Sequence, residues 1–592
     1  MKKLRNVLVL ALAFALVCTS MAFAEDLSTW AMETPVTVTV MKNQNPATVS
    51  YANGEDATNN IYYNAYRDEL GITMDFQIYA SGDEYSQKLT MAIASNDLPD
   101  LLYLPMDQYV QLARAGKLWD MGPVLEEYAS DLTMQCMNSD GGTLLDAAKV
   151  DGTLYCIPVG NAQRIPSQYL WIRKDWLTKL GLETPKTFDD VVAIAREFKN
   201  NDPDGNGEND TWGLGLCNEM SDYSGFGTAE GVLNAFGGSL LQQIWVADEN
   251  GNLVYMPTSQ GTRDGLEALA SMFQEGLINE EFGVTDSDGV GEAVAAGKCG
   301  LFYGGDGISW SYGRDAIANN PDCGWICLNA PAKDGGMATA YSFIQLEYVY
   351  AVNKNFEHPE ALVKLINFNN DRINSPDATL DSLAVWGVNP ETGINQCDYT
   401  YALVDPYQNK AIGYNTTIAQ VFAGELQPED LMPEAYRYYE GIKRYVDEGW
   451  DETGSANPED LTAFQYAMCW GPEFGSWTRY QEQNDENKIV TSAQYGAPTE
   501  TMVKRWSTLK DMQDETFTKI IAGSESIEAF DSFVEQWKSL GGDTIPSVSQ
   551  KWLSPLLRGS KFGQPEVVRI CKELILQAKS TTRPAGKAAG YE

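Results

Sequence analysis

The sequence of 592 residues contains a single histidine, His358, which directly precedes a proline. A Ser-His-Asp triad elsewhere, or a metal site built from several imidazoles, is therefore excluded by composition. Positive charge is also scarce, because 42 Lys and Arg stand against 82 Asp and Glu, for a formal net charge of −40. A surface of that sign repels nucleic acids and anionic membranes, so we expect no nucleic-acid partner.

Cysteine is too sparse for a disulfide framework, since ten cysteines are scattered over a long chain. Cys323 and Cys327 form a C-x3-C pair, but no second pair and no nearby histidine completes a zinc ligand set. We interpret the cysteines mainly as buried thiols, with one disulfide as the alternative.

Long apolar runs are absent beyond the start of the chain. There, a positively charged beginning precedes an apolar run over residues 7–17 and an A-x-A site that ends at Ala24. This pattern predicts a secretory signal peptide over residues 1–24, and the run is too short for a membrane span. A lipid anchor on Cys18 is a less favoured alternative, because the small residue expected just before such a cysteine is missing. We expect a secreted protein of the cell envelope, at the outer face of the cytoplasmic membrane.

Apolar patterns of strand and helix alternate along the chain, which indicates open α/β sheets with parallel neighbours. Gly71 should end one helix, and Thr187 should cap another. The predicted strands cover residues 36–40, 72–78 and 101–104, and the predicted helices cover 61–70, 85–94 and 188–198.

The stretch DPDGNGEND, residues 202–210, fits the first nine positions of an EF-hand calcium loop. Position 12 would be Gly213, so the usual bidentate glutamate is missing. The loop predicts a structural calcium ion, with a metal-free turn as the alternative. The ligands would come from Asp202, Asp204, Asn206, Asp210 and the backbone carbonyl of Glu208.

Several stretches occur in an order that resembles one protein family. They are LPDLLY (98–103), GKLWDMG (116–122), VDGTLYCIP (150–158), WIRKDWL (171–177), LGLETPKT (180–187), DPDGNGEND, GKCGLF (297–302), FTKIIAG (517–523) and FVEQWKSLGG (533–542). Together they resemble the large extracellular solute-binding proteins of carbohydrate ABC importers, in particular the oligosaccharide-binding lipoprotein group of Gram-positive bacteria. The likeness runs from about residue 36 to about residue 553.

The resemblance implies a type II periplasmic-binding-protein fold, with two α/β lobes joined by crossing strands and a ligand cleft between them. It also implies that the calcium in the 202–210 loop is structural. Crossings are expected near residues 157–170 and 343–352, with a third before Thr499. The expected division is a signal peptide over 1–24, lobe 1 over 33–165, lobe 2 over 166–342, a return mainly to lobe 1 over 343–480, and a return mainly to lobe 2 over 481–592.

Carbohydrate binding needs aromatic platforms and planar polar side chains. The chain has 15 Trp and 30 Tyr, many of which must pack in the core. Ordinary surface or core packing is the alternative for each candidate. The predicted ligand-binding residues are Trp310 and Asp306 after the strand-like residues 301–303, Trp470 and Trp386 beside glycines, Asn43, Gln44 and Asn45 after the first strand, and Arg164, Gln168 and Trp171 near the first crossing.

The sequence therefore predicts a monomeric receptor without enzymatic activity. It would bind a carbohydrate, an oligosaccharide in particular, and deliver it to the membrane permease subunits of an ABC importer, which a cytoplasmic ATPase drives. A secreted glycosidase is the alternative, because such an enzyme needs only two carboxylates and acidic residues are abundant.

Overall fold

The computed structural model describes residues 30–542, apart from 53, 162–168, 221–224, 249–251, 376–378, 388, 390, 391, 393, 405, 406 and 495–499. The predicted signal peptide, Cys18, Arg164 and Gln168 lie outside the described residues. The chain divides into two compact units. Unit 1 comprises Met1–Ala162, Gln345–Lys410 and Met432–Glu434, and unit 2 comprises Gln163–Ile344, Ala411–Leu431 and Ala435–Glu592.

Unit 1 is built on a five-stranded sheet with the order β2-β1-β3-β11-β4. Strand β1 runs parallel to β2 and β3, and β11 lies antiparallel between β3 and β4. The alternating and β-branched residues of the predicted strands favour this pleated, half-buried arrangement. The strands are β1 (Val36–Asn43), β2 (Ile72–Ala80), β3 (Leu101–Pro105), β4 (Ile157–Asn161) and β11 (Gln345–Val352).

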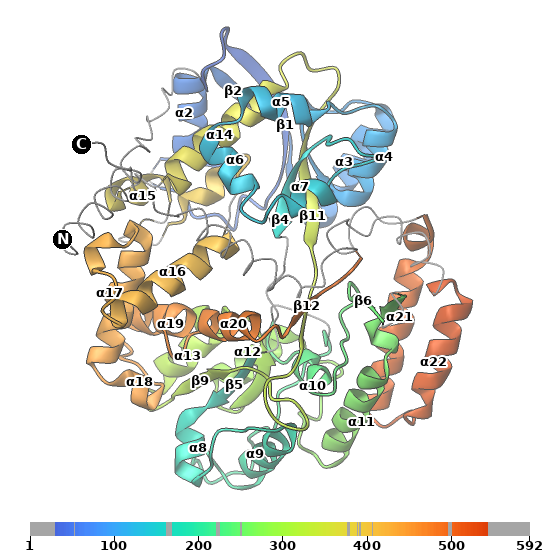
Figure 1. Cartoon of the computed structure of the whole chain (residues 1–592), viewed down its shortest axis with the longest axis vertical. Helices are drawn as coiled ribbons and strands as arrows, with labels where there is room; N and C mark the ends of the chain where they lie inside the picture. The colour runs from blue at the N-terminus through green and yellow to red at the C-terminus, as the bar shows by residue number, and fades with distance from the viewer. Residues whose placement is uncertain are drawn as a thin grey trace, which may run out of the picture. The chain divides into compact units, whose positions relative to one another are not determined.

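In unit 1, helix α2 has its predicted bounds, whereas α3 begins at residue 82, three residues before the predicted start. Helix α2 ends at Gly71, whose φ of 70° is a left-handed conformation that glycine adopts without strain. In Figure 1, α14 lies beside α5 and α6, against which it packs. The helices are α2 (Ile61–Leu70), α3 (Gly82–Ser95), α4 (Met106–Arg114), α5 (Met121–Tyr128), α6 (Asp131–Met137), α7 (Thr143–Ala147), α14 (Glu360–Asn374), α15 (Leu380–Trp386) and the 3-10 helix η4 (Gln396–Tyr399).

Unit 2 contains a three-stranded antiparallel sheet of order β8-β5-β9 and two short two-stranded sheets, β10-β12 and β6-β7. Helix α9 begins with the predicted cap, since Thr187 and Asp190 form a reciprocal capping box. The strands are β5 (Tyr169–Arg173), β6 (Trp245–Ala247), β7 (Leu253–Tyr255), β8 (Leu301–Gly304), β9 (Trp325–Leu328), β10 (Ala340–Ser342) and β12 (Ile489–Thr491).

Helices of unit 2 come from all three of its chain segments. Helices α21 and α22 lie side by side, with α11 along α21 (Figure 1). The helices are α8 (Lys174–Leu180), α9 (Phe188–Asn200), α10 (Glu230–Ala235), η2 (Met256–Thr258), α11 (Gln260–Gln274), α12 (Ser287–Ala295), η3 (Ile308–Trp310), α13 (Tyr312–Asn319), η5 (Pro428–Asp430), α18 (Trp450–Thr453), α19 (Leu461–Trp470), α20 (Ser476–Asp485), α21 (Glu500–Ile521) and α22 (Glu528–Ser539). Helices α16 (Tyr407–Phe422) and α17 (Pro433–Asp447) start in residues of unit 1 and continue in unit 2.

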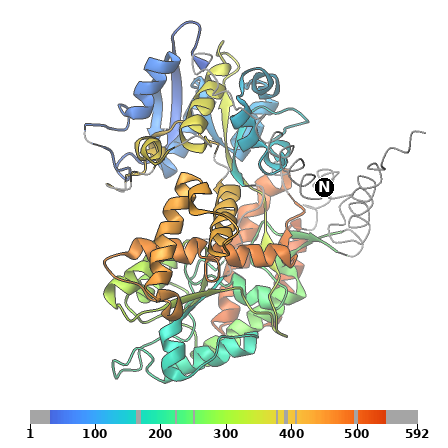
Figure 2. The same ribbon diagram turned by 60° about the vertical axis from the view of Figure 1, so that its left-hand side comes forward.

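The division differs from the expected one in the second half of the chain. The sequence assigned residues 343–480 mainly to lobe 1, whereas all of 411–431 and 435–480 belong to unit 2. The reason is packing: apolar side chains of α16, α17, α19 and α20 share one core with those of β5, β8 and β9. The orange helices α17, α19 and α20 accordingly gather in both views (Figures 1 and 2).

The changes of unit can be compared with the expected crossings. The first change follows Ala162, and the second follows Ile344, so both fall within expected stretches. The third follows Lys410, well before Thr499, and after a short return to unit 1 over residues 432–434 the chain stays in unit 2 from residue 435 onward. Within the described part of the chain, no helix combines the length and the apolarity that a bilayer crossing requires.

Trp537 of α22 tests the core that joins the last helices to the middle of unit 2. Its ring stacks on Tyr255 at 4.7 Å and lies 5.8 Å from Trp245. Replacing this buried ring leaves a cavity, so Trp537→Ala should lower the free energy of unfolding of unit 2 by about 3–5 kcal/mol. Thermal unfolding followed by near-UV circular dichroism measures the effect. The exposed neighbour Lys538→Ala should change it by no more than about 0.5 kcal/mol, and equal effects of the two variants would contradict the packing.

Candidate functional site

The carboxyl ends of four strands meet at one edge of the unit 1 sheet. Strands β1, β2, β3 and β4 point the same way, and β11 enters from this edge in the opposite direction. Ligands of open α/β sheets bind outside the carboxyl ends of strands. Asn43 is the last residue of β1, opposite Ala80 of β2, so the predicted loop after β1 lies at this edge.

Two of the three predicted ligand-binding residues of that loop, Gln44 and Asn45, form side-chain hydrogen bonds within the protein. The Gln44 side chain accepts from the Tyr79 hydroxyl at 2.8 Å and donates to the carbonyl oxygen of Asp398 at 3.0 Å. Asn45 is exposed, and its amide oxygen accepts from the backbone N–H of Ala47, which forms a turn. Gln44 therefore holds the loop in place, while Asn43 and Asn45 remain candidates for ligand contact.

Lys42 joins this edge to the 3-10 helix η4. Its buried ammonium donates to the Tyr63 hydroxyl and to the carbonyl oxygens of Asp398 and Thr400, each at 3.0 Å, and of Tyr399 at 3.3 Å. Burial lowers the pKa of Lys42 to about 7, and the charge of Asp398 offsets part of this decrease. The carbonyls at the end of η4 thus receive the donors that a helix end lacks.

Tyrosine pairs at this edge are the residues that the sequence analysis missed. Tyr51 stacks on Tyr399 with centroids 5.1 Å apart, and Tyr103 stacks on Tyr348 at 4.8 Å with an interplanar angle of 1°. Tyr51, Tyr103 and Tyr348 are each partly exposed. The abundance of tyrosine, twice that of tryptophan, was a signal for them, but composition alone does not distinguish exposed tyrosines from buried ones.

Trp386 has a packing role that its position before a glycine did not reveal. Its ring packs edge-on against Tyr62 at 5.2 Å and Phe368 at 5.7 Å, and the guanidinium of Arg372 lies 5.0 Å from it. These contacts attach α15 to α2 and α14. The half-buried ring is therefore mainly part of the unit 1 core.

In unit 2, Trp310 has an exposed indole on a rigid support. The side chain is 43% exposed, although Ile308 and Ser309 before it are buried. Its ring lies 6.2 Å from Trp470, nearly perpendicular, and 6.0 Å from Tyr466. Trp470 in turn stacks on Tyr438 at 4.0 Å. An aromatic face held in this way offers the flat apolar surface that a sugar ring can cover.

Of three other predicted ligand-binding residues in unit 2, two are buried and one is partly exposed. Trp470 and Trp171 are only 3% and 1% exposed, so neither ring can present a face to a ligand, and both are corrected to core residues. The indole N–H of Trp171 donates to the carbonyl oxygen of Gly305, which supports the loop before Trp310. Asp306 is partly exposed, and its carbonyl oxygen accepts from the Ser476 hydroxyl at 3.0 Å.

The 202–210 loop adopts a tight turn with converging oxygens. Asp202 accepts from the backbone N–H groups of Gly205, Asn206 and Gly207 at 2.9–3.1 Å. The Asn206 amide donates to Asp204 at 2.8 Å and to Asp210 at 3.1 Å. The side chains of positions 3, 5 and 9 thus meet, as a hard cation requires.

The charges of the loop also fit a divalent cation. Partial burial raises the pKa of Asp204, and its contact with Asp202 and the charge of Asp210 raise it further. A cation at this place would relieve that repulsion. Among the described residues, no three His, Cys, Asp or Glu side chains alone form a metal ligand set. A calcium ion here would therefore need the Asn206 oxygen and backbone carbonyls as well.

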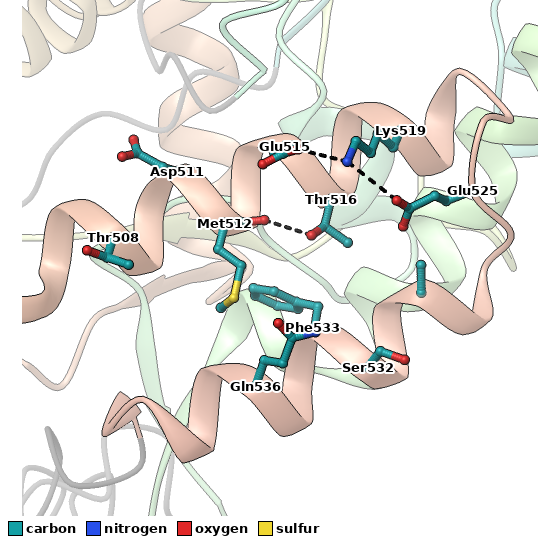
Figure 3. A pocket seen from close by; sticks show the side chains of 11 residues that line it. Thr508, Asp511, Met512, Glu515, Thr516, Lys519, Glu525, Ser532, Phe533 and Gln536 are labelled. Atoms are coloured by element: carbon teal, nitrogen blue, oxygen red, sulfur yellow. Dashed lines mark hydrogen bonds and ion pairs between the residues drawn. The ribbon is translucent and has the colours of Figure 1, made fainter.

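A groove between α21 and α22 is separate from all predicted residues. It has a volume of about 510 Å³, and its acidic rim is partly neutralised, because Lys519 pairs with Glu515 at 2.7 Å and Glu525 at 3.5 Å (Figure 3). Phe533 and Met512 contribute apolar surface to it. We assign no ligand to this groove.

Comparison with known proteins identifies the family. The model of the bacterial extracellular solute-binding proteins matches residues 51–369, which is more than half of the chain. The chain belongs to this family. The sequence-based resemblance is thereby confirmed at the level of the family.

Three relatives illustrate the likeness. The lipoprotein LipO of Bacillus subtilis strain 168 is 29% identical over 225 residues, which are 37% of this chain and 41% of LipO. The polygalacturonan/rhamnogalacturonan-binding protein YtcQ of the same strain is 24% identical over 466 residues, 77% of this chain and 81% of YtcQ. FusA, a fructooligosaccharide ABC transporter substrate-binding protein of Streptococcus pneumoniae, is 29% identical over 36% of this chain and 40% of FusA. The matches with LipO and FusA thus span less than half of those proteins.

The solved structure of FusA with kestose has the same fold. It matches with a TM-score of 0.56 at 16% sequence identity and covers 89% of this chain and 100% of the FusA chain. The expected type II periplasmic-binding-protein fold, with two α/β lobes, is confirmed by this likeness and by the two α/β units of the chain.

Lys42 predicts a pH dependence of stability. Its pKa is about 7 in the folded protein against an ordinary 10.5. At a pH between these two values the side chain is neutral when folded and protonated when unfolded, so unfolding takes up a proton. The contribution of Lys42 to the free energy of unfolding should rise by about 1.4 kcal/mol per pH unit in this window and fall as pH decreases toward 7.

Lys42→Met removes this contribution. Thermal unfolding at pH 7, 8 and 9 should show the parent gaining stability relative to the variant as pH rises. Lys117→Met, which replaces an exposed lysine of the same unit, should follow the parent. Parallel profiles of the parent and Lys42→Met would contradict the lowered pKa.

Proposed function

We propose that this chain is the extracellular substrate-binding receptor of an ABC importer and that it binds an oligosaccharide. The observation that carries the proposal is the exposed face of Trp310, which buried aromatic rings hold in place. Family membership supports a receptor, and FusA and YtcQ, two relatives, are named for carbohydrate ligands. The receptor would act as a monomer, hold no catalytic residues, and deliver its ligand to permease subunits at the outer face of the membrane.

Each unit offers candidate ligand-binding residues of its own. In unit 2, Trp310 supplies an apolar face, and the partly exposed Asp306 a hydrogen-bond acceptor. In unit 1, Asn43 and Asn45 supply amides, and the stacked pair of Tyr103 and Tyr348 supplies a second aromatic surface. Arg164 and Gln168 lie outside the described residues and stay candidates by sequence alone. The combination of aromatic faces with amide and carboxylate groups suits a ligand with many hydroxyls.

We also propose that the 202–210 loop binds calcium as a structural ion. The convergence of Asp204, Asn206 and Asp210 and the raised pKa of Asp204 support this assignment. A solved structure that matches this chain with a TM-score of 0.55 is named as an EF-hand mutant of FusA, and this supports the assignment. The ion would fasten the end of α9 to the following chain, and no ligand chemistry is assigned to it.

The carbohydrate proposal predicts both binding and an intact ligand. Thermal shift with a panel of fructooligosaccharides, neutral glucans and galacturonate oligomers should show stabilisation by at least one member, because a ligand that binds only the folded state raises Tm. Chromatography of the incubated glycan should show no shorter products. Shortened products would support the glycosidase alternative, and a panel without any stabilising glycan would overturn the substrate class.

Trp310→Ala tests the aromatic platform with the glycan that binds. The variant should weaken affinity about tenfold or more, which corresponds to about 1.4 kcal/mol. Isothermal titration measures the effect. Trp450→Ala, which removes another partly exposed tryptophan of unit 2, is the matched control and should leave the Kd within about twofold. An unchanged Kd for Trp310→Ala would exclude this residue from the site.

The calcium assignment predicts a metal-dependent melting temperature. Chelation should lower Tm, and added calcium should restore it, because the ion binds only the folded loop. A double variant, Asp204→Asn with Asp210→Asn, should lose this response. Asp288→Asn is the control, since Asp288 is an acidic residue of the same unit that lies in the first turn of α12, outside the 202–210 loop. The assignment fails if chelation leaves Tm of the parent unchanged.

A further inference from the structure

One buried thiol contacts the whole loop that carries Trp310. The sulfur of Cys469, near the end of α19, accepts the indole N–H of Trp310 at 2.9 Å. It also lies 3.6 Å from the hydroxyl of Ser309 and donates to the carbonyl oxygen of Asp306 at 3.9 Å. A single side chain of α19 thus contacts both ends of the 306–310 segment.

The environment keeps this thiol neutral. Cys469 is only 3% exposed, and burial raises its pKa to about 12. A protonated thiol in this position is a poor nucleophile. It retains its weak capacity to accept and donate hydrogen bonds, and its size and polarisability suit a contact with an aromatic ring.

The indole of Trp310 has few other constraints. Its ring contacts Trp470 and Tyr466 at centroid distances of 6.2 and 6.0 Å, and the residue is 43% exposed. These ring contacts hold the indole in place, but they are less directional than a hydrogen bond. The directed N–H···S bond selects one orientation of the ring from those that the contacts permit.

We propose that Cys469 is a positioning residue, which orients the Trp310 indole before the ligand arrives. The inference rests on the proposed function, in which Trp310 is the sugar platform. A ring that is already ordered loses less conformational freedom on binding, so the thiol contributes affinity without touching the ligand. The effect should appear as coupling between Cys469 and Trp310, because positioning has no consequence once the indole N–H is gone.

A double-mutant cycle tests this coupling. Cys469→Ala should raise the Kd for the bound glycan about three- to tenfold, and Trp310→Phe, which keeps a ring but lacks the N–H, should also raise it. Cys469→Ala made in the Trp310→Phe background should add less than about twofold. Cys469→Ser, which retains an acceptor, should recover most of the affinity. Equal effects of Cys469→Ala in both backgrounds would overturn the proposal.

A matched control separates positioning from core packing. Cys299 is also a fully buried thiol of the same core, and its sulfur donates to the carbonyl oxygen of Leu301 and has no bond to Trp310. Cys299→Ala should lower Tm as Cys469→Ala does but leave the Kd within about twofold. A rise in Kd that equals that of Cys469→Ala would mean that any buried cavity weakens binding, and would overturn the role of Cys469.

A ligand-free measurement distinguishes failure of the inference from failure of the proposed function. The indole N–H resonance of Trp310, assigned by its loss in Trp310→Phe, should exchange with solvent at least about tenfold faster in Cys469→Ala. Faster exchange in a protein that binds no glycan would uphold the positioning of the ring while the proposed function fails. Unchanged exchange and chemical shift would refute the positioning, even if the parent binds a glycan.

Discussion

The pairing of β11 with β3 and β4 is the interaction on which unit 1 depends. Residues 345–352 insert between β3 and β4, which both belong to the first segment of unit 1, and they complete ten registered positions along the two partners. The ladder places Tyr348 beside Tyr103 and aligns the carboxyl ends of the remaining strands at one edge. Because the two partners are separated from β11 by about 200 residues, this pairing costs loop-closure entropy that only a well-packed sheet can offset.

The edge that results is stabilised by buried polar groups rather than by apolar packing alone. Lys42 supplies donors to the carbonyls at the end of η4, and Gln44 supplies another. A buried ammonium is expensive to desolvate unless its hydrogen bonds are satisfied, so its four acceptors explain how it is tolerated there. The bond from Lys42 to the carbonyl oxygen of Tyr399 also fixes the backbone that carries the Tyr399 ring, which stacks on Tyr51. The aromatic pair thus depends on the same hydrogen bonds.

In unit 2, buried aromatic rings support the exposed side chain of Trp310. The stack of Tyr438 on Trp470 lies behind Trp310, and the thiol of Cys469 reaches the indole from the same helix. The exposed ring of Trp310 therefore depends on residues from two other segments, around 438 and 470. A receptor needs such rigidity, because each side chain that must become ordered on binding reduces affinity. The structural roles of Trp470 and Cys469 follow from this requirement, although neither side chain is exposed.

Local sequence determined the elements of this protein and its family. The capping box at Thr187, the left-handed Gly71 and the turn-forming 202–210 loop follow from backbone preferences of a few adjacent residues, so they could be predicted without the fold. The exposed Trp310 was found for the same reason, since a tryptophan among glycines after a strand tends to lie in a loop. Tertiary structure decided which aromatics are buried: Trp171 and Trp470 lie in the core and Trp386 is half-buried against α2 and α14, while Tyr103 and Tyr348, from strands far apart in the sequence, form a partly exposed pair. It also decided that residues 411–431 and 435–480 belong to unit 2. Burial depends on which segments meet, and those meetings join residues far apart in the chain, where no local pattern carries the information.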